Sequence, residues 1–349
     1  MRLITDSYLY RVISGEDRGV AAATLRGLFR VGECFYASAT RVRNKLYDVG
    51  SRKVHRLNVP VISIGNITAG GTGKTPIVRH LAIKLKEQGF APAILMRGYH
   101  RTSGGMSDEQ TLLSEQLEGQ EIVVHAQGDR VAGGRRVLAE NPKVNVFLLD
   151  DGFQHRRLAR DIDIVLIDAT NPFGFGHVHP RGLLRESLAG LGRATAIVLT
   201  RCEQVADAQL DSIEQDIHRN APAISIFRAS FIHPSIDSLK TRRIFAAAAI
   251  ANPAPFEFAL KNSSDYRGHW WFADHHDYTA GDLGEIRRRA IAAGADTIMV
   301  TEKDWVKLRL LPGASDGSLP ILRLEVEVKF ELADELRLWD LLGSRLQRP

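Results

Sequence analysis

The segment from Val59 to Thr75, VPVISIGNITAGGTGKT, decides the fold of this chain. Its first part is a short β-branched run that predicts a buried strand, and its second part is a glycine-rich turn. The next residues, Pro76 to Leu85, have the apolar spacing of a helix, and proline fits in the first turn of a helix. A strand that leads through such a turn into a helix directs backbone N–H groups and the helix dipole at one point, as in a phosphate-binding loop.

The residues of this loop indicate what it binds. Gly-Lys-Thr places Lys74 at the β- and γ-phosphates of a nucleotide and the Thr75 hydroxyl at Mg²⁺. A glycine-rich turn without a ligand is the alternative, but the order of strand, loop and helix argues against it. We therefore expect a phosphotransferase. The candidate nucleotide-binding residues of the loop are Thr68, Ala69, Gly70, Gly71, Thr72, Gly73, Lys74 and Thr75.

The loop departs from the common pattern G-x-x-x-x-G-K-[ST], because Thr68 stands where the first glycine is expected. It resembles the deviant loop of the class that includes ParA/MinD ATPases and metal-inserting GTPases. Partitioning ATPases carry a second lysine where this chain has Ala69. Because Ala69 replaces that lysine, we do not expect ATP-driven dimerisation of that type, and we expect a monomer.

Two adjacent carboxylates are candidates for the metal site. Asp150 and Asp151 end the apolar run Val144 to Leu149, where a carboxylate can reach Mg²⁺ or its waters. Neighbouring side chains on a strand point in opposite directions, so one carboxylate can face the metal while the other serves the loop. Asp-Asp-Gly is also good turn chemistry, but the phosphate-binding loop upstream favours the metal.

The nucleotide base is predicted less directly. A guanine-specific enzyme would carry Asn-Lys-x-Asp after a late strand, and the place for it follows Leu199. Thr200-Arg201-Cys202-Glu203 stands there, a poor match. Adenine, and hence ATP, is favoured.

Composition places the chain among globular α/β enzymes. Its 349 residues, 44% of them hydrophobic, suffice for two domains. Cys34 and Cys202 lie far apart without ligand-type neighbours, so neither disulfides nor a structural zinc site is expected. The sequence contains no run of about 20 apolar residues and no signal peptide, so we expect a cytoplasmic location. Nucleic acid is not an expected partner.

The basic excess lies at the N-terminus. Residues 1–56 contain 11 Lys/Arg against 5 Asp/Glu, although the net charge of the whole chain is only +5. Residues 17–47 form an amphipathic helical pattern with a basic side. Such a helix could rest on an anionic membrane surface, or it could pack on its own domain with a solvated charged face. Both readings stay open at this point.

Strands that alternate with helical patterns predict a mostly parallel sheet covered by helices on both faces, as in P-loop NTPases. Further strands are expected at 91–96, 121–125, 162–167 and 194–200. After about residue 220 the pattern predicts a second, smaller α/β domain on a two-strand linker. The expected boundaries are 1–222 for the P-loop domain, 223–232 and 319–328 for the linker strands, 233–318 for the smaller domain and 329–349 for a C-terminal helix.

Eight short motifs in one order resemble the tetraacyldisaccharide 4′-kinase family of lipid A biosynthesis, and the resemblance covers most of the chain. The motifs are Val59 to Asn66 with GGTGKTP, Arg97-Gly98-Tyr99, Ser107-Asp108-Glu109, Gly128-Asp129-Arg130-Val131, Asp150-Asp151-Gly152-Phe153-Gln154-His155, Gly182-Leu183-Leu184-Arg185-Glu186, Asp274-His275-His276 and Thr301-Glu302-Lys303-Asp304.

The resemblance implies an ATP- and Mg²⁺-dependent kinase that phosphorylates the 4′-hydroxyl of a tetraacyl glucosamine disaccharide 1-phosphate. The enzyme would be peripheral on the cytoplasmic side of the inner membrane. Asp108 would accept the hydroxyl proton, assisted by His275, and Lys74 would complete the catalytic set. Arg130, Arg185 and Glu186 would contact nucleotide phosphate or the phosphorylated sugar, or would close the two lobes. An N-cap role for Asp108 is the structural alternative.

The chain also departs from the family pattern. The family has Pro after Asp-Glu and after Arg-Glu, where this chain has Gln110 and Ser187, and His179 and Arg181 add donors before Arg185. A GTP-hydrolysing metallochaperone or maturation factor is the alternative function, but it would need a guanine motif and metal-binding Cys or His near the loop. A nucleotide-gated membrane scaffold is a third idea, against which Ala69 argues.

Overall fold

The computed structural model describes residues 8–98, 107–315 and 319–346. The chain divides into two compact units. The larger unit comprises Arg11–Phe231 and Val328–Pro349, and the smaller unit comprises Met1–Tyr10 and Ile232–Glu327. The expected linker at 223–232 and 319–328 stays a prediction. Its first part contains strand β7 (Ser225–Ile232) of the larger sheet, and its second part contributes strands to both sheets.

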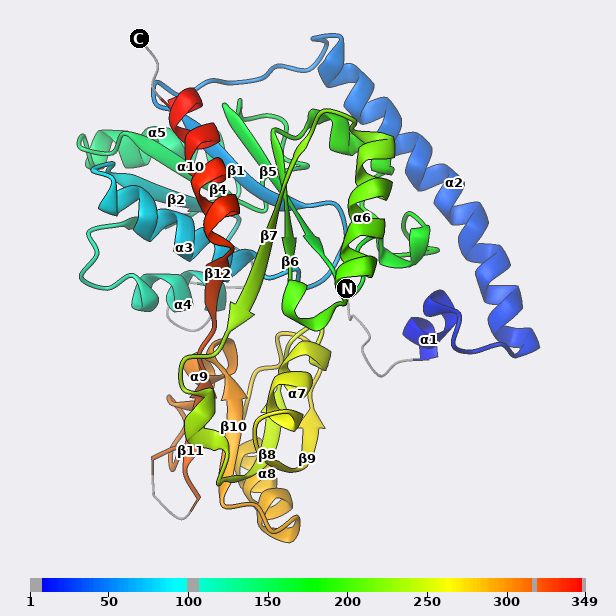
Figure 1. Ribbon diagram of the computed structural model, residues 1–349, viewed down its shortest axis with the longest axis vertical. Helices are drawn as coiled ribbons and strands as arrows, with labels where there is room; N and C mark the ends of the chain where they lie inside the picture. Colours follow the sequence, from blue (N-terminus) through cyan, green and yellow to red (C-terminus); the bar gives the residue numbers. More distant parts are fainter. Residues whose placement is uncertain (1–7, 99–106, 316–318, 347–349) are drawn as a thin grey trace. The chain divides into compact units, whose positions relative to one another are not determined.

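The larger unit is built on an eight-stranded sheet in the order β12-β7-β6-β5-β1-β4-β2-β3 (Figure 1). The central strand β1 pairs in parallel with β4 and with β5, so Ser63 has Leu149 on one side and Asp163 on the other. The five central strands of this sheet are buried along their whole length, which explains their continuous apolar runs. The predicted mostly parallel α/β fold is confirmed. The strands are β1 (Val61–Asn66), β2 (Pro92–Met96), β3 (Val123–Ala126), β4 (Val146–Asp150), β5 (Ile162–Asp168), β6 (Ala196–Thr200), β7 (Ser225–Ile232) and β12 (Glu327–Phe330).

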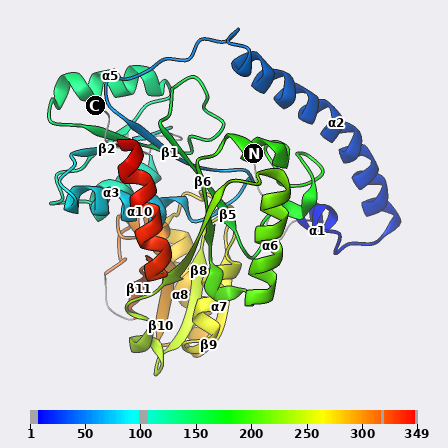
Figure 2. The ribbon, with the colours of Figure 1, turned by 45° about the horizontal axis from the view of Figure 1, so that its top comes forward.

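Helices cover this sheet (Figure 2). Helix α3 contacts β1, β2 and β4, and α5 contacts β2 and β3. Helix α6 packs with η2 over β5 and β6. The helical segments of this part are α1 (Tyr8–Ser14), α2 (Val20–Asp48), α3 (Lys74–Glu87), α4 (Asp108–Gln116), α5 (Arg130–Glu140), η1 (Gly174–Gly176), η2 (Leu188–Arg193), η3 (Cys202–Gln204), α6 (Asp207–Asn220) and α10 (Leu332–Leu346).

The glycine-rich loop joins the carboxyl end of β1 to α3, at the centre of the sheet where ligands of open α/β folds bind. Two glycines are required by close approach. A Cβ on Gly65 would lie 2.5 Å from the backbone nitrogen of Phe153, and one on Gly73 would lie 2.2 Å from the ring of Phe231. Gly73 also has a positive φ of 79°, which L side chains rarely adopt.

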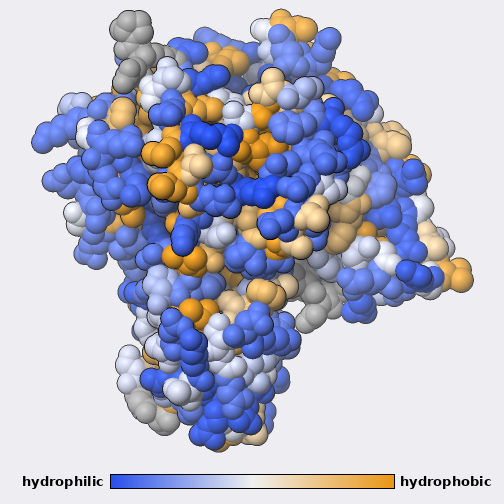
Figure 3. Space-filling model, viewed as in Figure 1, coloured by the Kyte–Doolittle hydropathy of each residue, from blue (hydrophilic) through white to orange (hydrophobic). Residues whose placement is uncertain are grey.

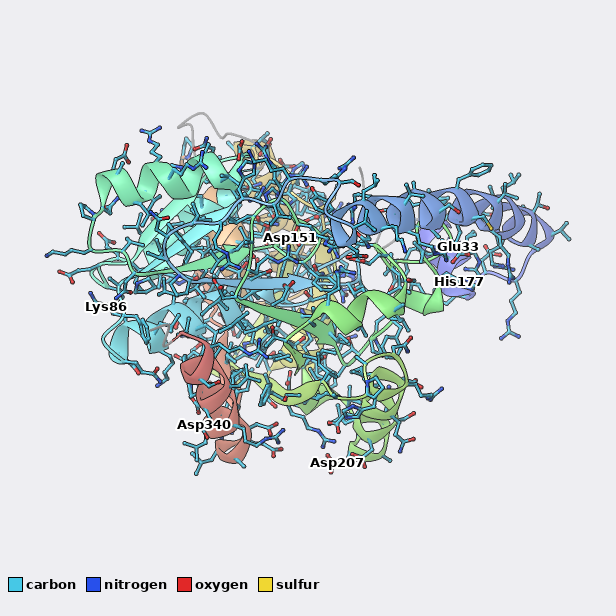
Figure 4. All side chains as sticks on the ribbon, turned by 90° about the horizontal axis from the view of Figure 1, so that it is seen from above. Glu33, Lys86, Asp151, His177, Asp207 and Asp340 are labelled. Atoms are coloured by element: carbon cyan, nitrogen blue, oxygen red, sulfur yellow. The ribbon has the colours of Figure 1, made fainter. Side chains whose placement is uncertain are left out.

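Helix α2 is 29 residues long and lies along one side of the larger unit (Figure 1). Few of its residues are buried, and those that contact the unit include Gly32, Glu33, Ala37 and Asn44. Figure 4 shows Glu33 beside His177, whose loop follows β5. Among the helices of the described residues, none has the length and apolar content needed to cross a bilayer.

The smaller unit contains a four-stranded parallel sheet in the order β11-β10-β8-β9. Two apolar clusters pack on it, one around Phe245 and Ile298 and the other around Ala246 and Leu260. Its elements are η4 (Ile236–Leu239), β8 (Arg243–Ala248), α7 (Ala254–Lys261), β9 (Asp265–Trp271), α8 (Ala280–Ala292), β10 (Thr297–Thr301), α9 (Glu302–Leu308) and β11 (Ile321–Leu324).

Candidate active site

The loop lysine already lies among polar groups of the neighbouring strands. Lys74 Nζ donates to Asn66 Oδ1 at 3.3 Å and lies 3.7 Å from Asp151 Oδ1. Asn66 is fully buried, and its Nδ2 donates to Thr68 O at 2.6 Å. Asn66 therefore connects the first turn of the loop to the lysine, a role that the sequence motif contained but did not reveal.

The two adjacent carboxylates have different environments. Burial alone would raise the pKa of Asp151, but the charges of Lys74 and Arg185 outweigh burial and lower that pKa below its usual range. Burial, together with the charge of Glu109, raises the pKa of Asp150 to about 7. Asp150 is 7% exposed, and its Oδ1 has no hydrogen-bond partner within residues 8–98, 107–315 and 319–346.

The environment of Asp150 tests whether the residues of this site suit Mg²⁺. A buried carboxylate oxygen without a donor is costly unless a cation or a proton neutralises it. Mg²⁺ in phosphoryl-transfer sites is bound through one or two carboxylates together with substrate phosphates. Asp150 at the end of β4 and Thr75 at the start of α3 fit that donor set. A group of three or more His, Cys, Asp or Glu side chains that could hold a metal without phosphate does not occur among the described residues.

Arg185 and Glu186 are adjacent in the sequence but have different surroundings. Arg185 contacts Asp151, near the loop. Glu186 is only 2% exposed and accepts from Asn44 of α2 at 2.7 Å, from Gln154 at 3.2 Å and from Arg193 at 3.0 Å. These contacts attach α2 to the sheet, so a contact of Glu186 with nucleotide stays a prediction.

The ends of β6 and β7 brace the glycine-rich loop. The Thr200 hydroxyl donates to Thr72 O at 3.0 Å, and Arg201 donates to Gly71 O at 2.8 Å. Arg201 also forms a buried ion pair with Asp168, and its guanidinium lies 5.6 Å from the centre of the Phe231 ring. In the sequence, Thr200 and Arg201 bear only on guanine recognition, because they stand where a guanine motif would be expected. Their contact with the loop could not be read from spacing along the chain.

Asp108 and Arg130 begin the helices α4 and α5. Asp108 is buried in the first turn of α4, whose N-cap is Ser107, and not Asp108 itself. Glu109 of the same turn acts on the charge of Asp150, which places the start of α4 near the end of β4. Arg130 is buried, and burial followed by the charge of Arg97 lowers its pKa. Tyr99 of the Arg-Gly-Tyr motif lies outside the described residues.

His275 belongs to the smaller unit, in the turn that follows β9. Its N–H donates to Ala249 O at 3.1 Å, and its Nε2 lies 3.2 Å from Lys303 Nζ. Because Asp108 belongs to the larger unit, the expected pairing of His275 with Asp108 stays a prediction.

Backbone strain coincides with these positions. Asp151, Arg201 and His275 have positive φ values of 52°, 59° and 62°. Non-glycine residues rarely adopt this conformation, and such residues cluster at functional sites. Asp151 and His275 are site residues predicted from the sequence, and Arg201 contacts Gly71 of the predicted loop.

Strand, phosphate-binding loop and helix, with a lysine at the loop and a carboxylate at the end of the adjacent strand, define a P-loop phosphotransferase. A family model described as "LpxK: Tetraacyldisaccharide-1-P 4'-kinase" matches residues 25–347. The chain belongs to this family.

Individual relatives agree with the family match. A protein named tetraacyldisaccharide 4'-kinase from Pelobacter propionicus is 34% identical over 362 residues, which covers 98% of each chain. One of the same name from Desulfotalea psychrophila is 37% identical over 80% of this chain and 88% of its own. A crystal structure of LpxK from Aquifex aeolicus, described as an "apo" form in complex with ATP, has 28% identity and a TM-score of 0.69 over 92% of this chain and 99% of that chain.

Proposed function

We propose that this protein transfers the γ-phosphoryl group of ATP to the 4′-hydroxyl of a tetraacyl glucosamine disaccharide 1-phosphate, a step of lipid A biosynthesis. The observation that carries the proposal is the meeting of three groups at one end of the central strands: Lys74, Asp151 and the Asp150 oxygen, which has no hydrogen-bond partner among the described residues. Family membership supplies the acceptor, because relatives across nearly the full length carry the name of this kinase. The alternative of a GTP-dependent metallochaperone has no comparable support.

The loop and the charged residues around it have proposed roles in binding ATP. The backbone N–H groups of residues 70–75 and the N-terminus of α3 receive the phosphates, and Lys74 neutralises the β- and γ-phosphates. Asp150 and Thr75 would hold Mg²⁺, which offsets charge on the transferring phosphate. Asp151 holds Lys74 and Arg185 in place. Arg130, buried at the start of α5, is proposed to contact phosphate.

Asp108 is the proposed acceptor of the hydroxyl proton. A bond forms between the sugar oxygen and the γ-phosphorus, the bond from that phosphorus to the ADP oxygen breaks, and the hydroxyl proton passes to the Asp108 carboxylate and then to water. Asp108 lies in the first turn of α4, where the helix dipole favours a negative charge. Phosphoryl transfer depends mainly on positioning and charge stabilisation, so one such base suffices. His275 would assist.

Helix α2 is proposed to bring the enzyme to its lipid substrate on the cytoplasmic side of the inner membrane. Six large apolar side chains on it are exposed: Tyr36 lies on another side of the helix, and the other five are Val20, Leu28, Val31, Phe35 and Val42. At 3.6 residues per turn they fall within an arc of roughly 80°. Exposed Arg30, Arg41 and Lys45 flank this stripe and suit anionic lipid headgroups. Figure 3 shows apolar patches along the edge of the larger unit where α2 lies.

Transfer of ³²P from γ-labelled ATP to purified tetraacyl disaccharide 1-phosphate in detergent micelles tests the proposal. We expect labelled lipid from the wild type, and losses of at least a hundredfold from Lys74→Ala and from Asp108→Asn. Lys261→Ala, an exposed lysine of the smaller unit, is the matched control. Hydrolysis of GTP without lipid labelling would favour the metallochaperone instead.

A further inference from the structure

The turn that carries His275 is held by helix α9, which begins with the Thr301-Glu302-Lys303-Asp304 motif. Lys303 Nζ lies 3.2 Å from His275 Nε2 and 3.6 Å from Asp274 Oδ1. Its side chain is partly buried, as is that of Asp274. The sequence predicts no role for the single members of this motif, and nothing in the proposed reaction uses Lys303.

The contact between Lys303 and His275 fixes which ring nitrogen carries the proton. A lysine ammonium has three donors and no acceptor, so the histidine nitrogen that it meets must accept. An imidazole nitrogen accepts only when it carries no proton. A neutral ring that accepts at Nε2 therefore carries its proton on Nδ1, and Nδ1 remains as a donor.

The backbone of the turn is held from the same helix. Lys307, one turn after Lys303, donates to His275 O at 3.2 Å and to His276 O at 3.1 Å. The His275 N–H donates to Ala249 O. These bonds maintain the positive φ of His275, a conformation that costs free energy and needs support from its surroundings.

Asp304 anchors α9 beneath this turn. Its carboxylate is buried, and it accepts from the Ala249 N–H at 3.0 Å, from the Tyr278 hydroxyl at 3.0 Å and from the Thr301 hydroxyl at 2.6 Å. Ala249 and Tyr278 lie on either side of His275 in the sequence. Asp304 therefore ties α9 to both segments that support the turn, and the position of Lys303 relative to the ring follows from it.

We propose that Lys303 is a positioning residue that holds His275 as the neutral Nδ1–H tautomer, so that His275 takes part in the reaction as a hydrogen-bond donor through Nδ1 and does not accept a proton at Nε2. This inference rests on the proposed role of His275 in the kinase reaction. The tautomer of His275 depends on residues of the smaller unit alone, so it can be measured without catalysis.

The first test is NMR of the full-length protein with ¹⁵N-labelled histidine rings at neutral pH. The chain has 12 histidines, and the His275→Gln variant identifies the signals of His275. We expect a protonated Nδ1 and an unprotonated Nε2 in the wild type. Lys303→Met should shift both ring signals toward the other tautomer, whereas Lys261→Met, a lysine change elsewhere in the same unit, should shift neither.

The second test is kinetic. Lys303→Met should lower kcat roughly ten- to hundredfold with an unchanged KM for ATP, because it misplaces a group at the reacting centre. Lys303→Arg keeps a donor and should recover part of kcat, and equal melting temperatures of the variants would exclude loss of folding as the cause. A wild-type ring protonated on Nε2, or ring signals that do not respond to Lys303→Met, would overturn the proposal. Changed ring signals with unchanged kcat would overturn its catalytic part.

The two proposals can fail separately. If His275→Gln retains full kcat, the role of His275 in the reaction is wrong, and the ring signals still decide whether Lys303 sets the tautomer. If the lipid is not labelled by the wild type, the proposed function itself fails.

Discussion

Arg185 donates from one guanidinium nitrogen to both carboxylate oxygens of Asp151, at 2.9 and 3.1 Å. Asp150, the preceding residue, has no donor at its Oδ1 within the described part of the chain. The alternation of side chains along a strand separates the two carboxylates, and the positive φ of Asp151 turns the backbone where β4 ends. Asp150 is thus the stronger candidate for Mg²⁺, and Asp151 organises the cationic groups.

We predict that Asp150→Asn and Asp151→Asn differ in their response to Mg²⁺. Asp150→Asn removes the charge proposed to meet the metal, so activity should fall at least a hundredfold and the Mg²⁺ concentration for half-maximal activity should rise. Asp151→Asn should lower activity with a smaller change in Mg²⁺ dependence, because its partners are Arg185 and Lys74. Phosphate transfer measured across a Mg²⁺ titration distinguishes the two. The reverse order would assign the metal to Asp151.

Much of the larger sheet could be predicted because its central strands are buried and largely apolar. The run Val144 to Leu149 predicted β4, which spans Val146–Asp150. Strand β9, Asp265–Trp271, was not predicted, because it lies at the edge of the smaller sheet and its exposed and half-buried residues give no continuous apolar run. Only hydrogen bonding to β8 makes this segment a strand.

The candidate site was less predictable than the fold, since it depends on contacts between distant segments. The loop and Asp150 follow from spacing around one strand pair. The bracing by Thr200 and Arg201 joins positions about 130 residues away, so no local pattern contains it. The contact of Glu186 with nucleotide or sugar is implied by the family resemblance alone. The Glu186 side chain lies among Asn44, Gln154 and Arg193, so that contact stays a prediction.

We predict that Thr200→Val raises the KM for ATP roughly three- to tenfold, the range expected for the loss of one hydrogen bond. The carbonyl and the following N–H of a planar trans peptide point in opposite directions. The bond from Thr200 to Thr72 O therefore directs the N–H of Gly73 away from β6, toward the side where the phosphates are expected. Steady-state kinetics with varied ATP measure the effect.

Two variants control this prediction. Thr200→Ser keeps the hydroxyl and should restore most of the affinity for ATP. Thr297→Val makes the same change at a fully buried threonine of the smaller unit, so it should affect melting temperature without raising the KM for ATP. An equal increase of KM in Thr200→Val and Thr297→Val would contradict a specific role for Thr200.

The stability of the protein should fall below pH 6.5 in a manner that depends on His155. Burial, and then the charges of Arg130 and Arg160, lower the pKa of His155 to about 4. The unfolded chain, with an ordinary pKa of 6.5, binds this proton first as the pH falls, so the free energy of unfolding decreases between pH 6.5 and 4. Allowing for partial exposure, we expect about 1–2 kcal/mol from this group.

The His155→Gln variant isolates this contribution. Because glutamine does not titrate, the variant should lose about 1–2 kcal/mol less than the wild type between pH 7 and 4.5. Other histidines with lowered pKa values, His80 and His179, are present in both proteins and cancel in the comparison. Chemical denaturation at the two pH values measures the difference. If the free energies of unfolding of the two proteins change in parallel with pH, the pKa of His155 is not lowered in the folded protein.

Membrane binding through α2 gives the last prediction. Phe35 is 75% exposed at the middle of the apolar stripe, and burying a phenylalanine in the headgroup region is worth about 1.5–3 kcal/mol. Phe35→Glu should therefore weaken binding to vesicles that contain phosphatidylglycerol at least tenfold. Leu310→Glu replaces an equally exposed residue, 76%, of the smaller unit and should have little effect.

The salt and substrate dependence of the same variants distinguishes this docking from a packing role for α2. Phe35→Glu should keep its activity on substrate dispersed in detergent micelles and lose it on substrate embedded in vesicles, because only the second requires docking. Binding of the wild type should weaken as salt rises, since Arg30, Arg41 and Lys45 contribute through screened charge. If Phe35→Glu and Leu310→Glu bind vesicles equally well, the stripe does not contact the membrane, and α2 serves only the contacts that Glu33 and Asn44 make with the rest of the larger unit.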